Sequence, residues 1–552
     1  MSLDLQTLVR SGRLRRVDAA LGALVARLFP DDTPEVALAA ALAARAVADG
    51  HNALPLDAAQ DWFARLEGHG AAPALPDPDD WRAALHASCA VRMGDAVSEA
   101  IAPLVLDTQG RIYLRRYFDC ERRLARNLIA RANARRLKLV TGGPGSGKTH
   151  GVVRLLVALA DNAHERSRTL RIALAAPTGK AAARLAESVR AQLPALPQVV
   201  AAMIPQDAAT LHRLLGLSPV AARAGFHRGA PLPFDVVVVD EVSMVDLPLM
   251  TKLAEAVRDD ATLILLGDPQ QLSAVEAGDV LGALVEAAQA PPLSACHEHL
   301  AHSRRFAPDS ALARLARAIA QGDAEAVLAA FGLDGCARLL VDDVHHPEWI
   351  AHVARVYRAV TDATDAAAAL QAAAHFRVLT ALRRGPSGSV ALNHAIEQSL
   401  KRHVGVRADA AWWRGRLLMV TANRSDIGLF NGDIGVVWPE AGGGMKVWFD
   451  DAGGALRALA PAALPPHEDA FALTVHKAQG SEFERVVLVP GGDSPVLTRE
   501  LFYTGITRAR TAVELHADGN LLRAGIARRT RRWNGLADRL RETAAESSPG
   551  AP

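Results

Sequence analysis

The residues Leu137–Thr149, LKLVTGGPGSGKT, join a short apolar strand to a glycine-rich turn and the start of a helix. Gly142 and Gly147, followed by Lys148 and Thr149, have the spacing of a phosphate-binding loop in its strand–loop–helix context. Glycines let backbone N–H groups curl around a polyphosphate, and the helix N-terminus favours its negative charge. We expect Lys148 to reach the β- and γ-phosphates of a nucleoside triphosphate and Thr149 to offer its hydroxyl to Mg²⁺. The residues expected to cradle the phosphates are Gly142, Gly143, Pro144, Gly145, Ser146 and Gly147.

The 552-residue chain is half apolar and has a net charge of +2, which indicates a globular protein of about three or four domains. Its start is charged and its apolar runs are strand-sized, so we expect no secretory signal, no membrane partner and a cytoplasmic location. The four cysteines are scattered without a CxxC pair, which favours reduced thiols. Cys296–His299, CHEH, contains metal-ligand residue types, but adjacent side chains point in different directions.

Residues 1–110 have the pattern of Ala/Leu-rich helices separated by Pro/Asp-rich breaks, without a catalytic constellation. They predict a helical N-terminal domain, which would be a docking module for a partner or a structural cap. Residues 111–136 are dense in arginine, with Tyr113, Tyr117 and Phe118 interleaved at helical periodicity. This helix would contact nucleic acid or nucleotide, or present a solvated face.

An α/β pattern follows the glycine-rich loop. Phe234–Val239 is wholly apolar, as in a parallel strand buried on both faces, and it ends in Asp240 and Glu241. Acidic residues at strand ends are often helix caps, but here a phosphate-binding loop supplies a partner. We expect Asp240 to hold Mg²⁺ and Glu241 to polarise the attacking water. After the next strand, Ala261–Leu266, Gln271 is placed to sense a γ-phosphate.

Five segments carry a family resemblance in their order along the chain. They are GGPGSGKT, APTGKAAARL, TLHRLLG, VVVVDEVSMVD and GDPQQLSAVEAGDV. Together they resemble the first motor domain of superfamily 1 DNA helicases, and the continuation after GDPQQL resembles the 5′→3′ branch and its RecD family. The resemblance implies an α/β fold with two RecA-like P-loop motor domains and ATP with Mg²⁺ between them.

The second half of the chain extends the resemblance. Ser303–Phe306, SRRF, matches motif IV, which implies that Arg305 touches the γ-phosphate. The segment FALTVHKAQGSEF resembles motif V and implies that Glu482 lies near the nucleotide sugar. LFYTGITRAR matches motif VI and implies that Arg508 is an arginine finger. The DNA-contacting residues that the resemblance implies are Thr178, Lys180, His212, Thr474 and His476.

Residues of about 415–465 switch to a β pattern with turn signals, which predicts a small barrel-like insert similar to the SH3-like insertion of this branch. We therefore predict a helical domain at 1–110 and a first RecA-like domain at 111–345. A second RecA-like domain is predicted at 346–540, followed by a disordered tail at 541–552. The basic stretch Arg528–Arg532 is predicted to be a solvated helix.

The resemblance implies ATP-driven 5′→3′ translocation on single-stranded DNA with duplex unwinding. RecD-like proteins occur as the alpha subunit of the RecBCD complex (exodeoxyribonuclease V), and as a longer stand-alone helicase. The short N-terminal region favours the subunit, acting with RecB-like and RecC-like partners on double-stranded DNA ends in recombinational repair and end degradation. No lysine has Asp or Glu two residues before it, so we expect nuclease chemistry only in a partner.

Two other functions stay open. One is a stand-alone helicase of the same branch; the other is a non-motor DNA-binding scaffold that keeps the helicase fold. A scaffold has no need of the whole set Lys148, Thr149, Asp240, Glu241, Gln271, Arg305 and Arg508. No glutamine lies between Gln109 and Lys148, where related helicases carry an adenine-reading glutamine, so base selectivity also stays open.

Overall fold

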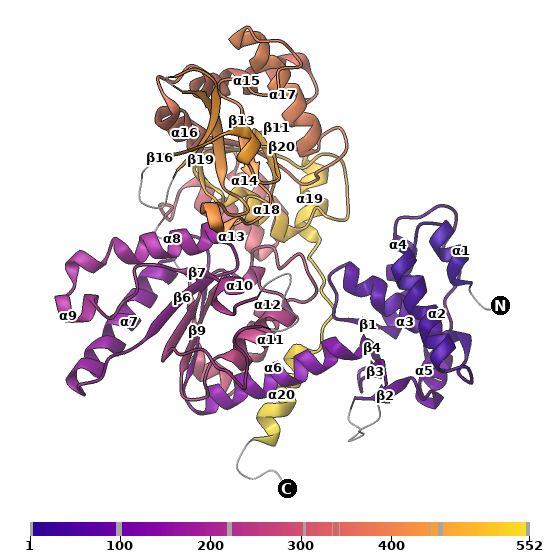
Figure 1. Cartoon of the computed structure of the whole chain (residues 1–552). Helices are drawn as coiled ribbons and strands as arrows, with labels where there is room; N and C mark the ends of the chain where they lie inside the picture. The colour runs from indigo at the N-terminus through magenta and orange to yellow at the C-terminus, as the bar shows by residue number, and fades with distance from the viewer. Residues whose placement is uncertain are drawn as a thin grey trace.

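The computed structural model describes residues 4–94, 102–217, 224–301, 305–333, 335–341, 343–440, 442–450 and 456–547. Two parallel sheets with flanking helices lie one above the other in Figure 1, and the N-terminal region lies to one side of the lower sheet. Ser303 and Arg304 of the predicted motif IV lie outside the described residues. No helix in the described ranges is both long and apolar enough to cross a membrane.

The first motor domain is a six-stranded parallel sheet in the order β10-β5-β9-β8-β6-β7. Its central strand β8 (Val236–Val239) is buried at all four residues, because helices cover both faces of a parallel sheet. The phosphate-binding loop and the acidic pair therefore meet at one edge, at the carboxyl ends of their strands. The other elements are α6 (Arg115–Asn133), β5 (Leu137–Gly142), α7 (Lys148–Glu165), β6 (Ile172–Ala176), α8 (Gly179–Arg190), α9 (Gln198–Ala201), β7 (Ala209–Thr210), α10 (Leu211–Leu214), α11 (Leu247–Ala256), β9 (Thr262–Gly267), α12 (Val280–Ala287) and β10 (His297–Leu300).

The second motor domain has a five-stranded parallel sheet in the order β11-β20-β19-β12-β18. The predicted boundary at residue 345 is wrong, because α13 and β11 already belong to this domain. Leu312, Leu315 and Ile319 of α13 are buried in the same core as Phe502, and β11 pairs with β20. The elements are α13 (Ala311–Gln321), α14 (Ala324–Ala330), β11 (Ala337–Leu340), α15 (Pro347–Thr361), α16 (Ala366–His375), β12 (Phe376–Thr380), α17 (Ser389–Val404), β18 (Ala472–Thr474), β19 (Phe483–Val489), α18 (Arg499–Ile506), β20 (Ala509–His516) and α19 (Gly519–Ala527).

The β-rich insert is an antiparallel five-stranded sheet in the order β16-β15-β14-β13-β17. Alternate residues such as Val437, Val447 and Phe449 build a small core of its own. The strands are β13 (Leu417–Val420), β14 (Ile434–Pro439), β15 (Met445–Asp450), β16 (Leu456–Leu459) and β17 (His467–Asp469). The insert is thus β-structured as expected, whereas its likeness to an SH3 barrel stays a prediction.

The N-terminal region is not wholly helical, contrary to the prediction. A four-stranded sheet in the order β1-β4-β3-β2 packs beside its helices. These strands are three or four residues long, too short to show an alternating pattern in the sequence. The elements are α1 (Leu5–Arg10), α2 (Arg16–Leu28), α3 (Pro34–Ala48), β1 (Ala53–Pro55), α4 (Leu56–Arg65), α5 (Pro78–Ala87), β2 (Val91–Met93), β3 (Leu104–Leu106) and β4 (Arg111–Leu114).

Two predictions about the C-terminus are wrong for the described residues, and residues 548–552 of the predicted tail lie outside them. Residues 528–535, all of them described, are in neither a helix nor a strand, and α20 (Leu536–Glu546) extends into the predicted tail. Leu536 and Leu540 of α20 are buried in the core of the first motor domain, which holds this last helix in place. Figure 1 shows the yellow C-terminal trace descending from the second motor domain past the N-terminal domain to α20 beside α6.

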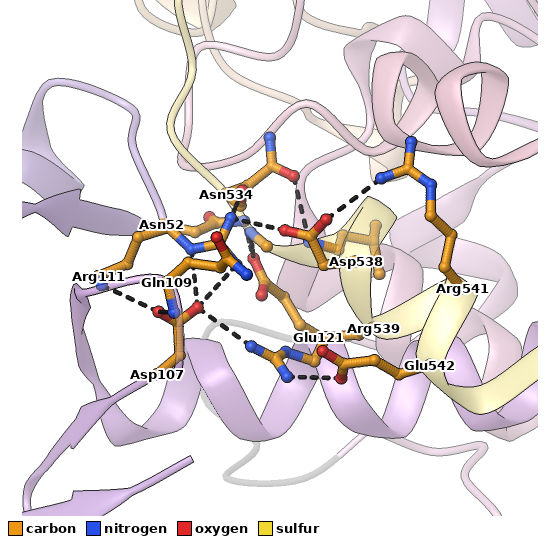
Figure 2. Close-up of polar contacts among 12 residues, drawn as sticks. Asn52, Asp107, Gln109, Arg111, Glu121, Asn534, Asp538, Arg539, Arg541 and Glu542 are labelled. Atoms are coloured by element: carbon orange, nitrogen blue, oxygen red, sulfur yellow. Dashed lines mark hydrogen bonds and ion pairs between the residues drawn. The ribbon is translucent and has the colours of Figure 1, made fainter. Parts of the chain in front are cut away.

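The arginine-dense helix α6 is anchored in the core at several positions, while Arg116, Arg123 and Arg126 stay exposed. Arg131 is buried and donates hydrogen bonds to four backbone carbonyls in and after the C-terminal part of α11. At the other end of α6, the fully buried Glu121 accepts hydrogen bonds from the Asn52 amide (3.2 Å) and the Gly535 N–H (3.0 Å). Figure 2 shows these contacts, which join the N-terminal domain, α6 and the C-terminal segment.

Glu121 provides a test of this junction. Burial raises the pKa of Glu121 to about 7, although the Gly535 and Asn52 hydrogen bonds oppose the shift. The folded state therefore favours the protonated form, and its stabilising contribution is present below about pH 4.5 and lost as the pH rises through 7. We expect Glu121→Gln, which stays neutral, to raise the local opening free energy of α20 by about 1–3 kcal/mol at pH 8 and by less than about 1 kcal/mol at pH 5.

Hydrogen exchange of the α20 amides measures this free energy. The control is Glu546→Gln, at an exposed position in the last turn of the same helix. An equal effect of Glu121→Gln at both pH values would show that Glu121 is not held neutral by the junction.

Candidate nucleotide-binding cleft

The loop between β5 and α7 has the backbone freedom that phosphate binding requires. Gly145 and Gly147 have φ angles of +71° and +84°, in the left-handed region that favours glycine. At Gly142 a Cβ atom would lie 2.7 Å from both the Ser146 hydroxyl and the Leu300 carbonyl oxygen. Larger residues would therefore force this loop away from β10.

Polar groups inside the loop are available to a ligand. The Lys148 ammonium donates to the carbonyl oxygens of Gly142 and Gly143, the latter at 3.0 Å. The Ser146 hydroxyl is buried and has no hydrogen-bond partner within the described part of the chain. Among those residues, none caps the N-terminus of α7 through its side chain. A bound triphosphate would supply acceptors for the Lys148 ammonium and the free N–H groups at this helix end.

The acidic pair follows β8 directly. The Asp240 carboxylate accepts a 2.8 Å hydrogen bond from the Glu241 N–H, and Glu241 itself has a left-handed φ of +54°. A non-glycine residue in that conformation is strained, a feature that clusters at functional sites. Burial, and next the charge of Glu241, raise the pKa of Asp240 to about 6, while the Lys148 ammonium lowers it. The acid pair and the loop lysine thus face each other.

These residues suit a magnesium ion chemically. Mg²⁺ takes hard oxygen ligands and usually binds one or two carboxylates together with substrate phosphates. Asp240 supplies a carboxylate opposite the loop, and Thr149 supplies a hydroxyl at the start of α7. The donor set therefore fits the metal that the sequence predicts.

A hydrogen-bonded chain crosses the cleft at Asp268. Its carboxylate accepts from the Gln271 side-chain amide (3.0 Å) and from the Tyr503 hydroxyl of α18 (3.2 Å), and all three residues are buried. One residue further on, the Leu272 N–H donates to the Thr504 hydroxyl of the second domain at 2.9 Å. The predicted γ-phosphate sensor Gln271 is therefore connected to the second motor domain by hydrogen bonds through Asp268 and through the next residue, Leu272.

Sequence reasoning missed the part played by Tyr503. It lies inside the quoted segment LFYTGITRAR, where only Arg508 was singled out. Its hydroxyl would lie 2.9 Å from a Cβ atom at Gly143, so α18 closes directly onto the phosphate-binding loop. A polar aromatic residue among apolar helix positions was the available signal.

Arg508 is buried, with 3% of its surface exposed. Its guanidinium donates to the carbonyl oxygens of Thr504 (3.1 Å) and Ser481 (3.2 Å), which fix its direction. Burial lowers the pKa of Arg508, and the carboxylates of Glu241 and Glu482 oppose that shift most strongly. The charge of Arg305 lowers the pKa of Arg508 further, and that of Asp268 raises it. The predicted finger therefore lies within electrostatic range of the predicted water-polarising residue across the domain boundary.

Glu482 lies in a cage of arginines. It pairs with Arg305, with Arg184 of α8 (3.3 Å) and with Arg510 (3.2 Å). Burial alone would raise its pKa, but Arg184, Arg305 and Arg508 outweigh burial and hold the pKa at about 2. Arg184, which the sequence did not single out, adds a second ionic link between the domains.

A cleft of about 500 Å³ opens beside the loop, between the two motor domains. Its walls include Gly143, Asp268 and His299 from the first domain and Phe306 and Tyr503 from the second. In the CHEH segment, where the sequence argued against a metal site, the rings of His297 and His299 both contact the Thr141 hydroxyl, at 2.8 and 2.9 Å.

The predicted DNA-contacting residues do not all gather in one place. Thr178, which caps α8, would lie 3.8 Å from a Cβ atom at Gly480, just beyond Thr474 and His476, so these segments of the two domains meet. Lys180 instead lines a separate cavity of about 580 Å³ beneath the insert, where burial lowers its pKa to about 8. His212, on α10, interacts with Asp246.

Family models match three parts of the chain. A model of the N-terminal domain of RecBCD enzyme subunit RecD matches residues 10–113. An AAA domain model matches residues 125–277, and a UvrD-like helicase C-terminal domain model matches residues 469–515. The matches follow the order of the N-terminal, first motor and second motor domains.

Whole-chain comparisons agree with the family models. RecBCD enzyme subunit RecD of Mycolicibacterium smegmatis is 38% identical, covering 92% of this chain and 95% of that relative. The Haemophilus influenzae subunit RecD is 34% identical, covering 75% of this chain and 72% of that relative. The ATP-dependent RecD2 DNA helicase of Deinococcus radiodurans is 33% identical over 74% of this chain, but over only 50% of its own length. The chain therefore belongs to the family of RecBCD enzyme subunit RecD.

Proposed function

We propose that this chain is an ATP-dependent 5′→3′ DNA helicase and translocase, and the motor subunit of a RecBCD-type (exodeoxyribonuclease V) complex. The observation that carries the proposal is that α18 closes onto the phosphate-binding loop: the Tyr503 hydroxyl donates to Asp268 across the cleft at 3.2 Å, and the buried Arg508 follows five residues later. An arginine from one RecA-like domain that faces the acidic residue of another suits hydrolysis coupled to domain closure. Family membership supports the DNA substrate.

Each residue of the cleft has a distinct task in hydrolysis. Lys148 binds the β- and γ-phosphates, and Glu241 orients and polarises the attacking water. Arg305 and Arg508 spread the negative charge that develops on the γ-phosphoryl group. Thr149 and Asp240 would hold Mg²⁺, which neutralises phosphate charge when bound.

Domain closure converts hydrolysis into movement. Arg305 and Arg508 gain their phosphate contacts only when a γ-phosphate is present, so ATP favours the closed cleft and its loss favours the open one. Thr178 and Thr474 lie on opposite domains, and closure changes the distance between the two segments. If each segment holds the DNA backbone, one cycle advances the protein along the strand without reading its sequence.

The partners follow from the family comparison. The match of residues 10–113 to the model of the RecBCD subunit RecD N-terminal domain, and the 38% identity to one such subunit, support the subunit over the stand-alone alternative. The proposal therefore includes RecB-like and RecC-like subunits, double-stranded DNA ends as substrates and a nuclease site in a partner. The scaffold alternative is disfavoured because Arg508 and Tyr503 are buried toward the cleft at a desolvation cost that binding DNA does not require.

Polarity is tested by displacement of streptavidin from biotinylated single-stranded oligonucleotides. A 5′→3′ translocase displaces streptavidin from the 3′ end and leaves it on the 5′ end. We expect ATP-dependent displacement from the 3′ end by the purified chain, alone and with its co-purified subunits, and its loss in Lys148→Ala. Displacement from the 5′ end by the chain alone would contradict the polarity, and ATP hydrolysis unaffected by Lys148→Ala would contradict the motor.

Removal of the finger tests the cross-cleft geometry. We expect Arg508→Ala to lower the kcat of ATP hydrolysis by about 10³- to 10⁵-fold while nucleotide binding is retained, because the lost charge acts in the transition state. Arg508→Lys should recover little activity, since an ammonium lacks the guanidinium fork. Single-turnover hydrolysis and the Kd for a fluorescent ATP analogue separate the two effects. The exposed Arg485→Ala is the control, and an equal loss there would remove the special role of Arg508.

A further inference from the structure

The segment that leaves the second motor domain is tied to that domain at its start. The Arg528 guanidinium donates to the carbonyl oxygens of Ser494 (2.6 Å) and Leu497 (2.9 Å). Two residues later, both the backbone N–H and the hydroxyl of Thr530 donate to the Glu500 carboxylate at 2.9 Å. Thr530 therefore moves with α18, the helix that carries Tyr503 into the cleft.

The same segment is tied to the N-terminal domain three residues later. The Trp533 carbonyl accepts from the Asn52 N–H (2.8 Å), and the Trp533 N–H donates to the His51 ring (3.0 Å). The two rings stack with centroids 4.3 Å apart, and burial lowers the pKa of His51 to about 4, which keeps the ring neutral as an acceptor. Only three residue steps join the two anchors, so they can lie at most about 11 Å apart, and a larger displacement of one anchor must move the other.

Arg532 lies between these anchors and joins two further segments. Its guanidinium donates to the carbonyl oxygen of Asp49 (3.2 Å) in the N-terminal domain and to that of Ala274 (3.0 Å) in the first motor domain. The Arg532 guanidinium packs directly against Gly50. The φ of this glycine is +87°, and a Cβ atom there would lie 0.9 Å from a guanidinium nitrogen of Arg532. The backbone at this position is shaped around the arginine.

Ala274 belongs to the loop that follows the γ-phosphate sensor Gln271. The loop is held by the second domain at Leu272, through the hydroxyl of Thr504 and the side-chain amide of Gln479. It is held by Arg532 at Ala274, and by the N-terminal domain at Gly278, whose N–H donates to the Gly50 carbonyl at 3.0 Å. This short loop of the first motor domain therefore contacts the second motor domain, the C-terminal segment and the N-terminal domain.

We propose that Arg532 is a positioning residue that couples the nucleotide state of the cleft to the N-terminal domain. The inference rests on the proposed ATPase function. When the second domain moves on ATP binding, Thr530 moves the short segment 530–533 with it. Arg532 passes this displacement to the Ala274 loop and to residues 49–53. The coupling is reciprocal: a partner protein seated on the N-terminal domain biases the sensor loop through the same guanidinium.

Hydrogen exchange of the full chain, with and without a non-hydrolysable ATP analogue, tests the coupling. We expect nucleotide to change exchange at 141–149 and 268–278 and also at 49–53, which lies outside the cleft. In Arg532→Gln the change at 49–53 should disappear while the change at 141–149 remains. The control Arg531→Gln removes a neighbouring exposed arginine and should behave like the unmodified chain.

The possible outcomes separate the two proposals. No response at 141–149 in the unmodified chain would overturn the proposed function. A response at 141–149 with none at 49–53 would overturn the coupling alone, and so would a response at 49–53 that survives Arg532→Gln.

Kinetics provide a second readout that a merely structural role would not move. We expect Arg532→Gln to lower the DNA-stimulated kcat by about 2- to 30-fold, with the KM for ATP changed less than about 2-fold. Arg532→Lys should not rescue, because one ammonium cannot span both carbonyls in the guanidinium geometry. Gly50→Ala, which displaces a guanidinium that is still present, should likewise abolish the nucleotide response at 49–53 while the response at 141–149 remains. A parallel fall in kcat and melting temperature in Arg532→Gln and Arg531→Gln alike would overturn the proposal.

Discussion

The structure depends on the placement of a buried positive charge against buried negative charges across a domain boundary. Arg508 leaves water almost completely, and so does Asp268, while Glu241 stands beside them in a strained conformation. Removing ions from water costs several kcal/mol each unless partners with good geometry compensate. Here the partners belong to different domains, so the compensation depends on how the domains sit. A nucleotide that alters the charge in the cleft therefore alters the preferred arrangement of the two domains.

Uncharged contacts reinforce this arrangement. Tyr503, Thr504 and Gln479 of the second domain make hydrogen bonds to Asp268 and Leu272, all within five residues of the end of β9. Each bond contributes about 0.5–1.5 kcal/mol on its own, but they share one loop and are made or broken together. The loop after β9 is thus the place where chemistry at the γ-phosphate meets the position of the second domain.

The sequence predicted the local features well and the long-range features poorly. The phosphate-binding loop, the wholly apolar β8 and the β-rich insert follow from spacing and periodicity, which are properties of short windows. The parallel sheets followed because the strands alternate with helices. The short strands of the N-terminal domain, the place of α13 in the second domain and the return of α20 to the first depend on tertiary packing. No short window around Leu536 or Leu312 indicates which core buries them.

The site shows the same division. Residues in glycine-rich or acidic motifs were placed by type and spacing, whereas Tyr503, Arg184 and Arg532 matter through partners hundreds of residues away in the chain. Lys180 shows that a residue inside a motif can also be misplaced by sequence reasoning. It lines a cavity under the insert, whose other walls come from residues distant in the sequence.

The return of α20 has a consequence for how the chain is made. The apolar face of α6 and part of α12 are completed by Leu536, Ala537 and Leu540, residues from the last helix. During synthesis the first motor domain emerges early but stays incomplete until residues 536–540 have left the ribosome. Its helix α6 meanwhile exposes an apolar surface, of the kind that makes folding intermediates of multidomain proteins prone to aggregate. Assembly of the ATPase therefore waits for a helix that is distant in sequence, and deletion of Leu536–Glu546 is expected to act on the core of the first domain and not on that of the second.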